Sequence, residues 1–216
     1  MDKKVILISI DGLRPDAVET CGHSFVNTLK KTDAIPWMQV LLCHRLPCRR
    51  IPRIFSQRTA HPPPGLSPTT TCRRYDRSAD WQNSWSVLTK TCAAFYGWEP
   101  MRHVWTSGNM KYSFFVNEYE EDNSDLLLTQ ESLSLIARKE PDFVYLYLVE
   151  TDDKGGHDHG WMTPEYMHQV NNAFSCVQQV YEAVHDRYTI VITADHGGHD
   201  RGHGENIPED MTIPMF

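Results

Sequence analysis

The sequence predicts an α/β domain with a mostly parallel central sheet and helices on both faces. Short runs rich in Val, Ile and Leu recur along the chain, as in strands that are buried on both faces of a parallel sheet. Longer segments with apolar residues at helical spacing separate these runs. Strands that alternate with helices in this order build parallel sheets, and such sheets bind ligands at the carboxyl ends of their strands.

The apolar runs place the strands. The first covers Lys3–Ile10 and ends at a turn, Asp11-Gly12. The later ones cover Thr91–Tyr96, Phe143–Val149 and Tyr188–Ala194, and a further strand starts within Thr212–Phe216.

Helices are predicted between these strands from their start and stop signals. Pro15 suits the first turn of a helix that runs to about Lys31. Leucines at helical spacing predict a helix over Ser124–Lys139, which Pro141 ends. Thr163-Pro164 is a cap and first-turn pair for a helix to about Val184.

Length and composition limit the function classes. The 216 residues fit a single domain over 1–216, and the net charge of -7 argues against a dedicated nucleic-acid binder. The apolar run Val5–Ile10 is too short for a membrane span, so we expect no membrane partner. The six cysteines include no C-x-x-C pair, which favours a reducing, cytoplasmic compartment. Nothing in the sequence indicates the oligomeric state.

Carboxylate and imidazole side chains gather directly after three of the predicted strands. These are the ligands of zinc and similar metals, and nearby glycines let the backbone bend so that the side chains face one point. Two metals about 4 Å apart could act together on a phosphoryl group. The candidates are Asp11 after the first strand, Asp152 or Asp153 with His157 after the third, and Asp195, His196 and His203 after the fourth.

Three motifs in this order resemble the alkaline phosphatase superfamily, in particular its type I phosphodiesterase/nucleotide pyrophosphatase family. They are V-I-L-I-S-I-D-G-L-R-P-D at 5–16, D-K-G-G-H-D-H-G at 153–160 and T-A-D-H-G-G-H-D-R-G-H-G at 193–204. The resemblance covers residues 1–33 and about 89–216.

The resemblance implies a two-metal hydrolase of phosphate esters that acts on a small-molecule ester or nucleotide. One metal would be held by Asp153, His157 and His203, and the other by Asp11, Asp195 and His196. Asp153 is preferred to Asp152 because Asp-x-x-Gly-His is the family's spacing. The metals would be zinc, with manganese as an alternative. A Thr in a Pro-Ser-x-Thr-Leu-Pro-like turn would form a covalent phosphoryl intermediate, and the printed sequence holds no such turn.

The segment 34–88 departs from the rest of the chain and falls where that turn is expected. Ala34–Tyr75 holds no Asp, Glu or Lys, whereas Cys43–Arg77 is rich in Arg. Codons shifted by one base over Leu42–Pro47 can read Met-Pro-Ser-Val-Thr, with the Thr across the Leu46/Pro47 junction. We therefore interpret this Pro/Arg-rich segment as a translation in a shifted frame.

Other interpretations stay open. The segment can be a genuine insertion, and the chain a catalytically inactive metal-binding pseudoenzyme. A related metal-dependent phosphomutase shares the ligands, but it uses Ser and carries a large inserted domain. The chain ends within the strand predicted from Thr212, so a C-terminal part of the family domain is expected to be missing.

Overall fold

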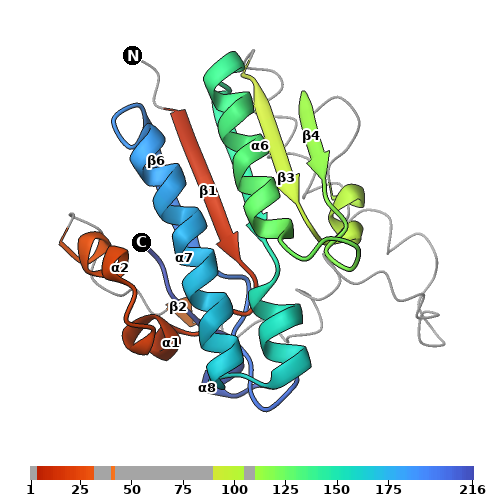
Figure 1. Cartoon of the computed structure of the whole chain (residues 1–216), viewed down its shortest axis with the longest axis vertical. Helices are drawn as coiled ribbons and strands as arrows, with labels where there is room; N and C mark the ends of the chain where they lie inside the picture. Colours follow the sequence, from red (N-terminus) through yellow and green to blue (C-terminus); the bar gives the residue numbers. More distant parts are fainter. Residues whose placement is uncertain (1–3, 32–39, 42–89, 105–109) are drawn as a thin grey trace, which may run out of the picture.

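A computed structural model of the chain describes residues 4–31, 40–41, 90–104 and 110–216. A five-stranded sheet forms the centre of this part of the chain (Figure 1). Its order is β4-β3-β5-β1-β6, and each neighbouring pair is parallel. The strands are β1 (Lys4–Ile10), β3 (Cys92–Tyr96), β4 (Tyr112–Phe115), β5 (Phe143–Leu148) and β6 (Tyr188–Thr193). The predicted parallel α/β sheet is confirmed, and β4 is a strand that the sequence did not predict.

Strand β1 lies between β5 and β6, and its three isoleucines share one buried face of the sheet because side chains alternate along a strand. Ile6, Ile8 and Ile10 are each at most 1% exposed. In the register, Ile8 pairs with Leu146 of β5 and with Ile192 of β6, which are also buried. Full burial of one such side chain is worth about 1.5–3 kcal/mol. This central packing fixes the positions where β1, β5 and β6 end.

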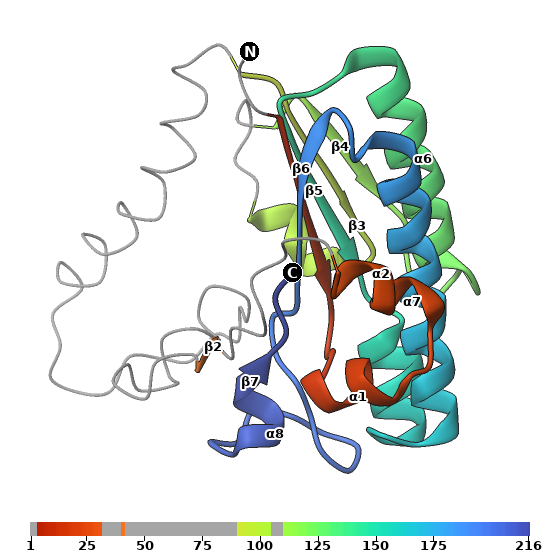
Figure 2. The same ribbon diagram turned by 90° about the vertical axis from the view of Figure 1, so that its left-hand side faces the viewer.

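Two long helices, α6 (Ser124–Lys139) and α7 (Pro164–Val184), pack on one face of the sheet (Figure 2). The hydroxyl of Thr163 accepts a hydrogen bond from the backbone N–H of Tyr166 and caps α7, as its sequence predicts. On the opposite side of the sheet, the described residues contribute a short 3₁₀ helix, η2 (Glu99–His103). Within the described residues, the two long helices thus cover one face of the sheet, and η2 lies on the other.

The helix predicted from Pro15 to Lys31 is divided into α1 (Pro15–Thr20) and α2 (Ser24–Leu29). The chain turns at Gly22, whose φ of 71° lies in the left-handed region that favours glycine. The prediction of one continuous helix was wrong because it ignored this residue. Both short helices lie beside α7 (Figures 1 and 2).

The strand predicted over Thr212–Phe216 is short. After α8 (Pro208–Met211), β7 (Thr212–Ile213) pairs antiparallel with β2 (Val40–Leu41) in a separate small sheet. Apart from Val40–Leu41, the anomalous segment 34–88 lies outside the described residues. In the described part of the chain, no helix is both long and apolar enough to span a membrane.

Candidate metal centre

Two groups of carboxylates and histidines meet at the carboxyl ends of β1, β5 and β6. Within each group, one ligand atom from every residue lies within 4.8 Å of the others. The Asp11 group comprises Asp11, Asp195 and His196, and the Asp152 group comprises Asp152, His157 and His203. Parallel strands end at one edge of the sheet, so residues far apart in the sequence come together there.

The ends of the strands that carry the Asp11 group hold its side chains in position. The backbone N–H of Asp11 donates to the carbonyl of Leu148, which ties β1 to β5 at this edge. His196 Nε2 lies 3.1 Å from Asp11 Oδ1. The other ring nitrogen, Nδ1, is 2.7 Å from the carbonyl oxygen of Gly197 and donates to it. That hydrogen bond fixes the ring and leaves Nε2 directed at the carboxylates.

Asp152 and His157 are brought together by a π-helix, η3 (Thr151–His157). The backbone N–H of Gly155 donates to the carbonyl of Glu150, five residues earlier, at 3.0 Å. This i→i+5 bonding places residues five apart on one face of the turn. Accordingly, Asp152 Oδ2 and His157 Nε2 are 3.3 Å apart, and His157 Nδ1 is 3.1 Å from the carbonyl oxygen of Arg201.

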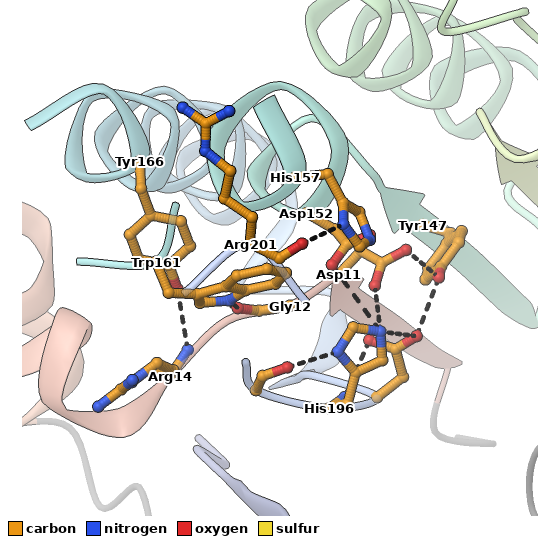
Figure 3. A network of polar contacts seen from close by, with 12 residues as sticks. Asp11, Gly12, Arg14, Tyr147, Asp152, His157, Trp161, Tyr166, His196 and Arg201 are labelled. Carbon is orange, nitrogen blue, oxygen red and sulfur yellow. Dashed lines mark hydrogen bonds and ion pairs between the residues drawn. The ribbon is translucent and has the colours of Figure 1, made fainter. Parts of the chain in front are cut away.

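The two groups form one continuous site. The rings of His196 and His203 stack with centroids 3.8 Å apart and planes at 15°. Asp152 Oδ1 is 4.0 Å from His196 Nε2. Figure 3 shows Asp11, Asp152, His157 and His196 converging on the same space. A ligand held by one group therefore lies within reach of the other.

The acidic and basic groups of the site shift one another's pKa values. Burial, followed by the charges of Asp195 and Asp152, raises the pKa of Asp11 well above its ordinary value. Burial lowers the pKa of His196, but Asp195 and Asp11 outweigh it and raise the net value well above 6.5. The hydrogen bond to Asp152 raises the pKa of His157 to about 9. The carboxylates therefore attract positive charge, which protons or metal ions can supply.

Two carboxylate oxygens test whether the residues fit a metal. Asp11 Oδ1 and Asp152 Oδ1 are buried and have no hydrogen-bond partner among the described residues. A buried carboxylate oxygen without a donor is costly. Both atoms face His196 Nε2, at 3.1 and 4.0 Å. Oxygen and imidazole nitrogen are the donors that zinc and manganese accept, so the residues fit a divalent metal.

Asp153 was predicted to hold a metal with His157 and His203, and this stays a prediction. The structure groups Asp152 with these two histidines. The family spacing assumes four residues from Asp to His, whereas the π-turn aligns residues five apart. The Asp153 carboxyl instead neighbours Glu118. Burial and then Asp152 raise the pKa of Asp153, and burial and then Asp153 raise the pKa of Glu118 to about 9.

Sequence reasoning also missed Tyr147, which links two predicted ligands. Its hydroxyl contacts Asp11 Oδ2 and lies 2.9 Å from Asp195 Oδ2 (Figure 3). Burial, followed by Asp11 and Asp195, raises the pKa of Tyr147 well above 10, so the hydroxyl keeps its hydrogen. The sequence did carry a signal for this role, since Tyr147 stands near the end of a buried strand. A buried hydroxyl needs a hydrogen-bond partner, and the carboxylates predicted at that edge of the sheet could supply it.

Comparison with solved structures defines the class of fold. The murine ectonucleotide pyrophosphatase/phosphodiesterase 5, an inactive form in complex with AMP, is 16% identical with a TM-score of 0.57, over 90% of this chain and 57% of that one. The phosphonoacetate hydrolase of Sinorhizobium meliloti 1021 with phosphonoformate is 14% identical with a TM-score of 0.53, over 91% and 56%. A Vibrio parahaemolyticus protein in the alkaline phosphatase superfamily is 13% identical with a TM-score of 0.56, over 100% and 60%. The fold is thus alkaline-phosphatase-like.

A sequence model of the family described as type I phosphodiesterase/nucleotide pyrophosphatase matches residues 54–207. The chain belongs to this family. The matched range includes 54–88, where the motif resemblance was expected to fail, and begins after the Asp11 motif. A search of curated proteins gives no match. The chain spans between 56% and 60% of the length of the three solved structures named above.

Proposed function

We propose that the chain is a two-metal-dependent hydrolase of small phosphate esters or nucleotides. The observation that carries this proposal is the pair of adjacent carboxylate–histidine groups at one edge of the parallel sheet. Asp11, Asp195 and His196 would hold one metal, and Asp152, His157 and His203 the other. Zinc is the first choice because aspartate and histidine are its common ligands, and manganese is the alternative.

Family membership and the similar folds support this reaction class. The murine and S. meliloti structures hold AMP and phosphonoformate, respectively, which both carry a phosphorus-centred anion. Two divalent ions would stabilise charge on such a group and lower the pKa of an attacking hydroxyl. We extend the substrate class to this chain by analogy with those proteins.

Hydrogen bonds within the chain orient the side chains that would bind the metals. The Tyr147 hydroxyl contacts one oxygen of Asp11 and one of Asp195, which restrains both carboxylates. His196 donates from Nδ1 to Gly197 and presents Nε2. His157 is held through Nδ1 by the carbonyl of Arg201. Ligands restrained in this way lose little conformational entropy when a metal binds.

The nucleophile that we propose is a threonine that forms a covalent phosphoryl intermediate. It would attack phosphorus, displace the leaving group and then lose the phosphoryl group to water. The printed sequence offers no such turn, and segment 34–88 lies almost wholly outside the described residues. We attribute its absence to a shifted frame. Sequencing the source DNA over codons 30–92 tests this, because an in-frame reading would instead favour an inactive chain.

Hydrolysis of bis(4-nitrophenyl) phosphate tests the activity. The protein expressed from DNA in which the shifted frame is corrected, and which therefore carries the threonine turn, is stripped with chelator, and Zn²⁺ or Mn²⁺ is then added back. We expect activity only with added metal, and a loss of at least 10²-fold in His203→Asn. His159→Asn is the matched control, because His159 is exposed and belongs to neither group. Turnover in chelator, or equal loss in both variants, would contradict the proposal.

An inactive chain that binds two metals would instead identify a metal-binding pseudoenzyme.

We further propose a reducing, cytoplasmic compartment, because the cysteines of the described residues, Cys21, Cys92 and Cys176, are free. Cell fractionation checks this, and recovery of the protein from an oxidising compartment would refute it.

A further inference from the structure

Trp161 contacts all three segments that carry the metal groups, although it offers no ligand atom. It lies between η3 and α7 and is 6% exposed. Its indole N–H donates to the carbonyl of Gly12, which follows Asp11, at 2.9 Å. Its backbone N–H donates to the carbonyl of Asp200, in the loop that connects His196 to His203, at 2.8 Å. Figure 3 shows the indole beside Gly12.

The faces of the ring pack directly on two glycines. A Cβ added at Gly198, two residues after His196, would lie 2.2 Å from Trp161 Cε2. A Cβ added at Gly156, which precedes His157, would lie 2.6 Å from Cη2 and Cζ2. Both distances are far below van der Waals contact, so the indole occupies the space of a side chain at each position. Glycine is required here by the ring, in addition to any turn geometry.

The ring also meets the Asp152 group itself. The imidazole of His157 lies 5.4 Å from the indole centroid at 83°, and that of His203 lies 6.0 Å away at 68°. These are edge-to-face contacts, the favoured arrangement of aromatic rings. The indole therefore touches the Asp152 group through two ligand rings, and the Asp11 group through the backbones of Gly12 and Gly198.

We propose that Trp161 is a positioning residue that sets the spacing between the two metal groups. A planar ring with two rotatable bonds is a rigid spacer, and its N–H bond to Gly12 fixes its rotation. The proposal rests on the proposed function, because it requires both groups to bind a metal. Replacing a group that supports metal ligands typically weakens metal binding about 10–100-fold.

Manganese is the probe for this role, because the electron paramagnetic resonance spectrum of two nearby Mn²⁺ ions reports their exchange coupling. We expect the full chain to bind two Mn²⁺ ions with a coupled spectrum. In Trp161→Phe, which shortens the spacer and removes the N–H, we expect weaker binding of the second ion, by about 10–100-fold, and altered coupling. Trp98→Phe is the matched control and should match the wild type, because Trp98 belongs to neither metal group and packs against a second hydrophobic cluster, formed by Ala94, Tyr96, Met101, Tyr147 and Val149.

Gly198→Ala keeps the indole but forces it from its position, and it covers the case in which Trp161→Phe does not fold. We expect the same change in coupling in this variant, with circular dichroism establishing that it folds. Wild-type affinity and coupling in the folded variants would overturn the role of Trp161 and leave the proposed function intact. Failure of the wild type to bind two ions would overturn both.

Discussion

Glu118→Gln should make the metal-free protein more stable, and increasingly so as the pH rises. Glu118 follows β4 and is 3% exposed, and neither carboxylate oxygen has a hydrogen-bond partner among the described residues. Burial, followed by the charge of Asp153, raises its pKa from 4.5 to about 9. The folded chain therefore keeps a proton on Glu118 that the unfolded chain releases above pH 4.5.

Proton linkage gives the direction in which the free energy of unfolding changes with pH. Between the two pKa values the folded state binds one proton more than the unfolded state, so the free energy of unfolding falls as the pH rises. The slope for one proton is about 1.4 kcal/mol per pH unit, or roughly 4 kcal/mol between pH 5 and pH 8. Glutamine does not titrate, so the stability difference between Glu118→Gln and wild type should grow by up to this amount.

Urea denaturation in chelator at pH 5, 6, 7 and 8 measures this difference. Burial and then Glu150 raise the pKa of Asp125 to about 8, so Asp125 also makes the free energy of unfolding depend on pH. Subtracting the wild-type free energy from that of the variant removes this contribution. Glu131→Gln is the control for the substitution itself, because Glu131 is exposed on α6. A flat difference for Glu118→Gln would refute the reasoning, since it would mean that Glu118 is ionised in the folded state.

The roles of two further carboxylates, Asp142 and Asp210, predict changes in the free energy of unfolding that denaturation experiments can check. Asp142→Asn should cost about 1–2 kcal/mol at neutral pH, because the carboxylate accepts from Thr91 N at 2.7 Å and Oγ1 at 3.0 Å. The backbone N–H of Thr91 lowers the pKa of Asp142, so this contribution should vanish only as the pH falls below 3.8. The hydrogen bond to Asp210 raises the pKa of His199 above 6.5, so the stabilisation that it provides is lost as the pH rises through the raised pKa. Asp210→Asn should therefore abolish the part of the pH dependence of the unfolding free energy that lies above pH 6.5. Equal slopes in Asp210→Asn and wild type would contradict this account.

Much of the fold could be predicted because its signals are local. The helix over Ser124–Lys139 was placed from leucine spacing and Pro141, and the structure gives the same bounds. The buried strands were apparent as apolar runs, within about one residue at either end. Strand β4 was missed because Tyr112–Phe115 is short and half-exposed, so it carries neither an apolar run nor a clear alternation.

The site was predicted less completely because its details depend on backbone geometry. Asp11, Asp195, His196, His157 and His203 were proposed from the strand ends together with the family motifs, and the structure brings all five into the two groups. Choosing between Asp152 and Asp153 requires the helical repeat of the following turn, and the π-turn of η3 leaves no clear mark in the sequence. Trp161 and Tyr147 escaped because their roles are contacts between segments more than a hundred residues apart.

The zinc content of three chains tests the central claim most directly. Asp152→Asn and Asp153→Asn remove one charge each from adjacent positions of η3, but only Asp152 belongs to a metal group. After saturation with Zn²⁺ and removal of free ion, elemental analysis should find two zinc ions per wild-type chain, two in Asp153→Asn and one in Asp152→Asn. One zinc in Asp153→Asn and two in Asp152→Asn would contradict the assignment, and a wild-type chain without bound zinc or manganese would contradict the metal centre itself.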